Sequence, residues 1–353
     1  MKSVFSYQIM FRVLPLLVVA ALLVMGWVPA DPAFAALPFM ALATTPFPTT
    51  PQLTAIAIAY RNTRLIADDV LPRVMVADQS FKYLKYPSGT FFTVPDTKVG
   101  RKSAPGQVEM SATETSDSTE DHALDDAVPY ADIQSAASQP NLPDPLMKAT
   151  EFVSDLLLLA REKRAADLVF TAGNYGANNK STLSGTSQWS DFTNSDPVSA
   201  VLTALDTCIM RPNIGIFGRA SWTKFATHPK ICKAVFGNNT DAGVVSRAQV
   251  AALFELEDVL VGEGWINTAK KGQAASMARV WGKHAVFAYR NKTADTQRGT
   301  TYGITAQWGG RIAGSQYEKN IGMRGGEIVR VGESVKELLT ANDLAYMFEN
   351  AVA

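Results

Sequence analysis

The sequence has little of what enzymes and metalloproteins use for chemistry. Among its 353 residues are only two cysteines, Cys208 and Cys232, and three histidines, His122, His228 and His284. The histidines lie far apart, and none stands at metal-ligand spacing from another histidine or from a cysteine. Two cysteines cannot form a disulfide framework, so buried reduced thiols are expected. The sequence therefore predicts no metal site.

A net charge is also lacking. Lys plus Arg number 33 and Asp plus Glu number 33, so no overall basic field draws the chain to nucleic acid. No repeat of solenoid period is visible. The length allows a sizeable core in one large or two modest domains.

Recognisable catalytic and cofactor motifs are missing as well. The segment 174–181 ends in Lys-Ser like a phosphate loop, but asparagines at 174 and 179 replace its glycines. The segment 309–314 lacks dinucleotide-loop spacing, and its glycines are expected to bend the backbone at a sheet edge. The carboxylates between 114 and 126 lack the calcium-loop pattern and indicate a solvated acidic face. We therefore expect no catalytic residues, no cofactor and no enzyme.

The amino terminus resembles a secretory leader. Lys2 and Arg12 precede an apolar run from 13 to 28, and Ala33-Phe34-Ala35 offers a small-x-small cleavage site before Ala36. The run is marginally short for a membrane span. Met40 offers a second start without a targeting segment. Residues 1–39 are thus either a signal-like leader or a misassigned upstream extension, and we favour Met40 as the start.

The chain does contain a long polar segment, residues 81–144, which we call the excursion. Residues 81–102 carry five Lys and Arg against one Asp, whereas residues 108–144 carry nine Asp and Glu with no Lys or Arg. These two limbs can pair with each other or with another copy of the chain, each pair contributing about 0 to 1 kcal/mol. We expect residues 81–113 to project as a long hairpin that turns between Pro95 and Pro105.

An unusually long helix is predicted directly after the excursion. Asp144 can cap its first backbone donors, Pro145 suits the first helical position, and nothing from 146 to 170 breaks it. The expected apolar stripe, with Arg161 off it, consists of Met147, Phe152, Val153, Leu156, Leu157, Leu159 and Ala160.

The remainder predicts a mixed α+β body. Strands are expected at 214–217, 259–261, 285–289, 301–308, 328–331 and 335–339. Helices are expected at 222–228 with Ser221 as cap, at 251–256 with Ser246 as cap, and in a last short turn capped by Asn342.

This order of parts resembles the tailed-bacteriophage major capsid proteins of the Hong Kong 97 type. The matching parts are an N-terminal arm at 40–80, an extended loop with an acidic return at 81–144, and a spine helix with peripheral and axial domains at 145–353. Within the last part, Arg211–Phe217, Leu256–Gly262 and the strands from 285 to 339 resemble their counterparts in that family.

The resemblance implies a coat protein that assembles in the host cytoplasm into hexamers and pentamers of an icosahedral head shell. Its implied partners are itself, a scaffold, a portal, a maturation protease and double-stranded DNA bound without sequence specificity, with no membrane for the mature chain. The extended loop would lie across a neighbouring subunit and pair basic with acidic residues. The candidate contact residues are Lys98, Arg101, Lys102, Asp117, Asp121 and Asp125.

Two other functions stay open at this stage. One is a related bacterial nanocompartment shell that encloses an enzyme. The other is a secreted α+β protein, exported through the signal-like leader, with a binding or enzymatic role that the sequence does not specify.

Overall fold

The computed structural model describes residues 47–85, 94–107, 113–139, 141–237, 242–296 and 298–353. The chain divides into two units, Met1–Phe47 and Pro48–Ala353, and only Phe47 of the first is described. The expectations for the leader at 1–39 and for a start at Met40 lie outside the described residues. The second unit is α+β, as the sequence predicts, and contains two main sheets.

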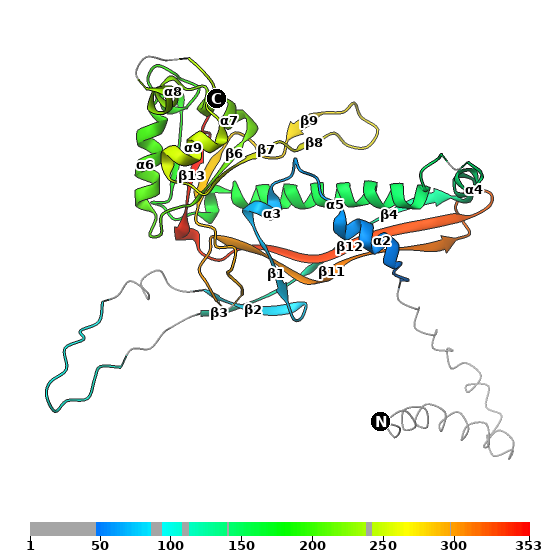
Figure 1. Cartoon of the computed structure of the whole chain (residues 1–353), viewed down its shortest axis with the longest axis horizontal. Coiled ribbons are helices and arrows are strands. Elements are labelled where there is room, and N and C mark those ends of the chain that lie inside the picture. The colour runs from blue at the N-terminus through cyan, green and yellow to red at the C-terminus, as the bar shows by residue number, and fades with distance from the viewer. Residues whose placement is uncertain (1–46, 86–93, 108–112, 140, 238–241, 297) are drawn as a thin grey trace, which may run out of the picture. The chain divides into compact units, whose positions relative to one another are not determined.

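A four-stranded sheet forms one half of this unit (Figure 1). Its strands are β1 (Arg73–Val76), β11 (Gly303–Glu318), β12 (Gly326–Leu339) and β4 (Glu120–Pro129), in the order β1-β11-β12-β4. β1 runs parallel to β11, whereas β12 is antiparallel to both β11 and β4. The acidic return of the excursion is therefore an edge strand of this sheet.

A five-stranded sheet forms the other half. Its order is β5 (Lys180–Thr182), β13 (Ala345–Glu349), β10 (Ala285–Ala288), β6 (Ile214–Gly218) and β7 (Asp258–Gly262). One face is covered by α6 (Pro197–Thr207), α7 (Arg219–Ala226), α8 (Pro229–Phe236) and α9 (Arg247–Phe254). Trp189 lies in this core with ring centroids 4.9 Å from Phe225 and 5.2 Å from Phe348, so stacked aromatic rings fill much of it.

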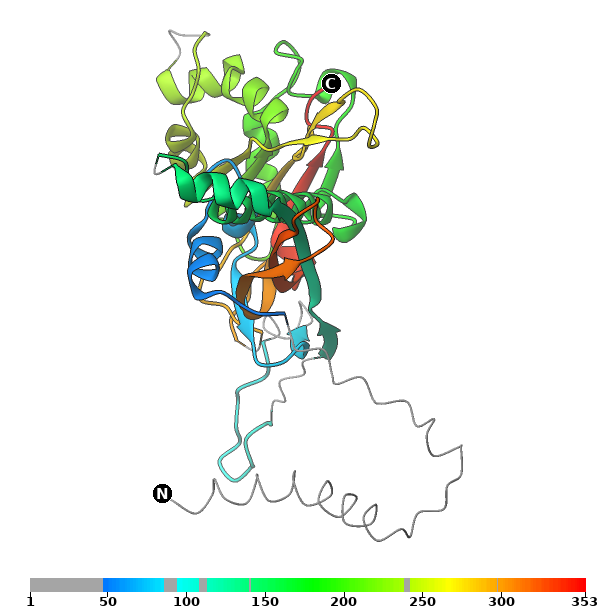
Figure 2. The ribbon, with the colours of Figure 1, turned by 90° about the vertical axis from the view of Figure 1, so that its right-hand side faces the viewer.

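The long helix α5 (Pro145–Val169) joins the two halves. As predicted, the Asp144 side chain accepts a hydrogen bond from the Leu146 backbone at 2.9 Å, and Pro145 opens the helix. Near its start Ala149 packs with Val128 and Val329 of the four-stranded sheet, and near its end Val169 packs under the five-stranded sheet. Figures 1 and 2 show α5 running between the two sheets.

The predicted apolar stripe of α5 is partly wrong. Val153 and Leu157 are buried, but Met147, Phe152 and Leu156 are 41%, 58% and 39% exposed. The buried face instead includes polar side chains. Two of them are Thr150 and Ser154, whose hydroxyls donate to the carbonyls of Leu146 and Thr150 one turn earlier. Because the helix satisfies these groups itself, their burial does not leave a polar atom unpaired.

The segment expected as an extended arm, 40–80, is folded onto the body wherever it is described. It contains α2 (Pro51–Ala59), α3 (Ala67–Val70) and β1. Leu53 and Ala57 of α2 are buried against Val153 and Leu157 of α5. This burial of apolar surface explains why the segment does not remain extended.

The excursion begins and ends as a hairpin. β2 (Ser80–Lys85) pairs antiparallel with β3 (Thr113–Ser118), and Phe81 and Tyr83 of β2 cover Ile304 and Ala306 on the sheet. Residues 94–107, which contain the expected turn, are described as exposed and form neither helix nor strand. The other residues between β2 and β3 lie outside the described ranges.

Two strands predicted at 328–331 and 335–339 are one continuous strand, β12. The Gly332-Glu333-Ser334 sequence suggested a break between two strands. Instead, the backbone of Gly332 lies so close to Ala123 of β4 that an added Cβ atom would be 3.1 Å from the Ala123 side chain, and Glu333 is buried among ion pairs. The glycines from 309 to 314 bend β11 as expected, at a point where β11 has passed the end of β1 and pairs only with β12, so it forms the local edge of the sheet. Gly309 has φ +65°, and the pairing register shifts between Trp308 and Ile312.

Three local predictions are also corrected. β11 continues to Glu318 instead of ending near Trp308. Helix α7 begins at Arg219, earlier than expected, with Gly218 in the cap position, whereas Ser221 lies inside it. Asn342 starts a short 3-10 turn, η3 (Asn342–Leu344), without capping it, and the chain continues into β13.

The remaining elements are short. They are α4 (Tyr130–Ser138), β8 (Trp265–Asn267), β9 (Met277–Arg279), η1 (Ala172–Asn174) and η2 (Gly185–Ser187). β8 and β9 pair only with each other, as a separate two-stranded hairpin.

Candidate functional site

The largest group of buried charges lies where α5 meets the four-stranded sheet. Glu333, whose side chain is fully buried, accepts hydrogen bonds from Arg73 Nη1 at 2.9 Å and Arg311 Nη2 at 3.1 Å. Arg161, 1% exposed, donates to Asp68 Oδ1 at 2.5 Å and to Thr305 Oγ1 at 3.0 Å. These side chains come from α5, α3, β1, β11 and β12, so the network links the helix to segments distant in sequence. The sequence reading missed it, because Arg161 looked like a surface residue.

The network keeps its carboxyl groups ionised. Burial by itself raises the pKa of Asp68 and of Glu333, but the neighbouring arginines reverse this effect and hold both pKa values below the ordinary 3.8 and 4.5. For Asp68 the arginines are Arg161 and Arg73, and for Glu333 they are Arg73 and Arg311.

Glu162 occupies a second buried position on α5. Its carboxylate accepts hydrogen bonds from the backbone of Ile66 at 3.0 Å and Ala67 at 2.8 Å, and from the Trp281 indole. Burial raises its pKa, although these donors oppose the shift. Glu162 thereby holds the start of α3, and also Trp281 in the connection between β9 and β10, against α5.

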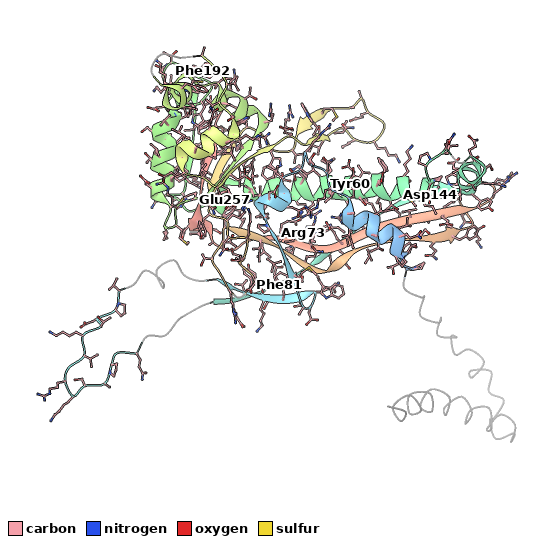
Figure 3. All side chains as sticks on the ribbon, viewed as in Figure 1. Tyr60, Arg73, Phe81, Asp144, Phe192 and Glu257 are labelled. Carbon is pink, nitrogen blue, oxygen red and sulfur yellow. The ribbon has the colours of Figure 1, made fainter. Side chains whose placement is uncertain are left out.

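A groove of about 880 Å³ lies beside this network. Its lining combines the apolar side chains of Ile58 and Met75, which are 57% and 64% exposed, with Arg61 and Lys292. Figure 3 shows Tyr60 and Arg73 on the chain segment that borders it along α5. The groove carries no arrangement of groups that points to a particular ligand.

The basic candidate residues lie together on the exposed segment. Lys98, Arg101 and Lys102 all belong to the exposed residues 94–107. None of their side chains has an ion-pair partner within the described parts of the chain. These residues contribute no contact that would hold the subunit's own fold together.

The acidic candidate residues are spread along β3 and β4, and two of them bind side chains of their own chain. Asp125 pairs with Arg330 of β12 through two contacts of 2.7 Å. Asp121 accepts a hydrogen bond from Ser334 of β12, and Asp117 is half-buried on β3, where it accepts a hydrogen bond from the Ser118 backbone at 2.8 Å. The acidic limb therefore pairs in two ways. Glu114 binds Lys82 of the basic limb at 2.7 Å, as the sequence predicts, whereas Asp125 and Glu120 bind the β12 cations Arg330 and Lys336.

A buried Ser–His pair lacks the geometry of an activated nucleophile. The Lys230 backbone donates to His228 Nδ1 at 3.2 Å, so the ring proton lies on Nε2, which is 3.0 Å from Ser195 Oγ. Nε2 therefore donates to the serine and cannot accept its proton. Burial, aided by the charge of Lys230, lowers the pKa of His228 below its ordinary value of 6.5.

Other reactive groups are equally enclosed. Cys208 and Cys232 are buried and free, as predicted, and burial raises the pKa of Cys208 to about 11. Within the described ranges, no group of three or more His, Cys, Asp or Glu could hold a metal ion. In the same ranges, no helix is long and apolar enough to cross a membrane.

Known proteins resemble this chain over most of its length. No family model matches it. The chain is 55% identical over 312 residues to the major capsid protein of Pseudomonas phage JBD67, an alignment that covers 88% of this chain and all of that protein.

Two solved structures share the fold. A phage-related protein from Bordetella bronchiseptica RB50 has a TM-score of 0.67 and 23% identity, covering 86% of this chain and 98% of that one. The capsid structure of cyanophage P-SCSP1u has a TM-score of 0.52 and 10% identity, covering 82% and 89%.

Removing the charge of Glu333 should strongly destabilise the subunit. Glu333→Gln leaves Arg73 and Arg311 without their buried counter-charge, for which we expect a loss of about 3 to 5 kcal/mol in urea unfolding. The matched control is Glu120→Gln, which removes an exposed pair with Lys336 on the same sheet and should cost less than about 1 kcal/mol. Equal losses for the two variants would contradict the central role of the network.

The same network predicts loss of stability in acid. The pKa values of Asp68 and Glu333 are lowered by folding, so their contribution is present above their ordinary values of 3.8 and 4.5 and is lost as the pH falls through the folded values. Glu162, whose pKa is raised, contributes in the opposite sense. We expect the thermal midpoint to fall below about pH 4, and to fall less steeply in Glu333→Gln. Parallel pH profiles for both proteins would contradict this.

Proposed function

This chain belongs to the phage major capsid proteins, and on that premise we propose that its copies build a closed icosahedral head shell around double-stranded DNA. The observation that carries the proposal is the 55% identity to a phage major capsid protein over that protein's whole length. The chain is thus a structural protein of the phage capsid that associates with copies of itself. The icosahedral geometry, the hexamers and pentamers and the enclosed DNA are the proposed part.

The described surfaces support self-assembly. Residues 94–107 are exposed throughout, and Val94 is 91% exposed. A segment that adds nothing to its own core is suited to contact a neighbouring subunit, where its apolar and basic side chains would be buried. We propose that Lys98, Arg101 and Lys102 make such contacts, with the acidic strands β3 and β4 of the next copy as counterpart.

The acidic strands can contribute unequally to that contact. Asp117 is half-buried and has no ion-pair partner among the described residues, whereas Asp125 already binds Arg330. An incoming cation would therefore share Asp125 with Arg330 but could pair with Asp117 directly. We accordingly propose Asp117 as the stronger contact residue, with Asp121 and Asp125 as weaker ones.

The proposed parts of the subunit follow the two sheets. We propose that α5 is the spine, that the four-stranded sheet forms the peripheral domain and that the five-stranded sheet with α6–α9 forms the axial domain. The arm at 40–80 then includes α2 and α3, and the extended loop with its acidic return occupies 81–144. Assembly in the host cytoplasm with a scaffold, a portal and a maturation protease completes the proposal.

Two features favour this function over the alternatives. A relative that covers 88% of this chain is a phage major capsid protein, which supports a phage head over an enzyme-enclosing nanocompartment. The zero net charge suits a shell that encloses DNA without binding it tightly. A secreted protein of another kind would leave the relationship to capsid proteins unexplained.

The purified protein should assemble into particles. We expect both the full chain and residues 40–353, expressed with and without a scaffold partner, to yield closed shells or rings of five or six subunits in electron micrographs. Light scattering gives the mass of the assemblies. A monodisperse monomer at high concentration in every one of these preparations would contradict the proposal.

Charge reversal on the exposed segment should weaken assembly without unfolding the subunit. In Lys98→Glu/Arg101→Glu/Lys102→Glu, the proposed contacts become repulsive, so particle yield should fall, while the thermal midpoint of the subunit should stay unchanged. The control is the charge-conserving triple variant Lys98→Arg/Arg101→Lys/Lys102→Arg. An unchanged yield and salt resistance in the reversed variant would eliminate this contact.

A further inference from the structure

The β8–β9 hairpin exposes large apolar side chains on a rigid support. Trp265 is 45% exposed and Met277 is 57% exposed. The register pairs Trp265 with Arg279 and Asn267 with Met277, which places all four side chains on one face. Trp and Met are enriched in protein–protein contacts, so this face resembles half of an interface.

The support of this face is well anchored. The Arg279 guanidinium lies 3.9 Å from the centroid of the Trp265 ring, and Arg279 also donates to the Glu263 carbonyl at 3.3 Å. The Glu263 carboxylate binds Arg219 at 3.1 Å and Arg247 at 2.8 Å. The indole is therefore held in place before any partner arrives, which reduces the entropy lost on binding.

The hairpin is also uniformly basic. From Trp265 to Lys283 the sequence contains no Asp or Glu. Its tip carries Lys270 and Lys271, both exposed and without an ion-pair partner among the described residues. Gly272 follows them at φ +90°, a conformation that favours glycine and turns the chain back.

A second surface, formed by helix α4 and strand β4, is acidic and also exposes apolar side chains. Helix α4 has nine residues, and none of them is buried. It packs on the subunit through Ile133, which is partly buried against Val128, Ala149 and Val329, and a helix of this length needs such packing to persist in water. The first turn of α4 exposes Tyr130, at 46%, and Asp132. On β4, which leads into α4, Leu124 is 40% exposed and Asp126 is half-buried. We call these four residues the α4 corner.

The two surfaces do not pair with each other within one subunit. Figures 1 and 2 show the hairpin and α4 at separate places along α5. Neither Asp126 nor Asp132 has an ion-pair partner among the residues described. One chain thus carries a basic apolar projection and an acidic apolar corner that only another copy can bring together.

We infer that the β8–β9 hairpin of one copy docks on the α4 corner of a second copy. This inference rests on the proposed function, because the two surfaces meet only when one copy of the chain binds another. Trp265 and Met277 cover the exposed apolar side chains of the corner, Tyr130 and Leu124. Lys270 and Lys271 lie against Asp126 and Asp132. Each contact is heterologous, so repeating it extends an assembly instead of closing a dimer.

A charge swap tests this contact in the full chain. Lys270→Glu/Lys271→Glu and Asp126→Lys/Asp132→Lys should each lower particle yield about tenfold, because each places like charges across the contact. Combining all four substitutions in one chain restores opposite charges and should restore the yield. Lys270→Arg/Lys271→Arg serves as the charge-conserving control and should assemble normally.

A cross-link provides a measurement that does not depend on yield. Lys271→Cys and Asp132→Cys are made in separate chains, mixed during assembly and oxidised. We expect a disulfide-linked pair that contains one chain of each kind, detected by intact mass. The native Cys208 and Cys232 are buried, so they contribute little background.

The outcomes separate the contact from the function. Full yield for both charge-reversed variants, or no mixed disulfide in assembled particles, overturns the contact while the wild-type particles uphold the function. Loss of yield that the fourfold variant fails to restore also overturns the pairing of these two surfaces. Failure of the wild-type chain to assemble at all overturns the proposed function and, with it, the contact.

Discussion

The fold depends on one buried set of ion pairs between α5 and the four-stranded sheet. Arg161 on the helix and Glu333 on β12 are almost completely enclosed, and charges so placed are tolerated only when they are paired. Their partners come from the segment 68–73 and from β11. Arg311 also donates to the Ala57 carbonyl at 2.7 Å, which adds α2 to the same set. This set of ion pairs and hydrogen bonds therefore links α5, the four-stranded sheet and the amino-terminal segment.

The consequence is a single helix with two different faces. One face of α5 is buried against both sheets, so this helix sets the orientation of each sheet. The other face leaves Phe152 and Leu156 partly exposed to solvent, at 58% and 39%. A helix that carries apolar side chains on both faces is suited to a protein whose second set of contacts forms only after assembly.

The charged side chains divide in the same way, into those that pair within the subunit and those available to a neighbouring copy. The acidic strand β4 neutralises cations of β12, as Asp125 does with Arg330, and its charged side chains also protect a long sheet edge from pairing with other strands. Cations without an ion-pair partner among the described residues include Lys98, Arg101 and Lys102 on the segment 94–107 and Lys270 and Lys271 on the β8–β9 hairpin. Individually such surface charges stabilise little, but a shell repeats each contact many times.

The sequence by itself determined the α+β class, the start of α5 at Asp144 and Pro145, the hairpin that begins at Phe81 and the two buried thiols, because capping residues, strand patterns and composition act locally. It also placed Lys98, Arg101 and Lys102 on an exposed segment. Only the tertiary structure decided which face of α5 is buried, that Glu333 lies within one continuous strand, and that Asp125 is taken by Arg330. These outcomes depend on partners far away in the sequence, 93 positions for Arg161 with Asp68 and 205 for Arg330 with Asp125, which no local pattern contains.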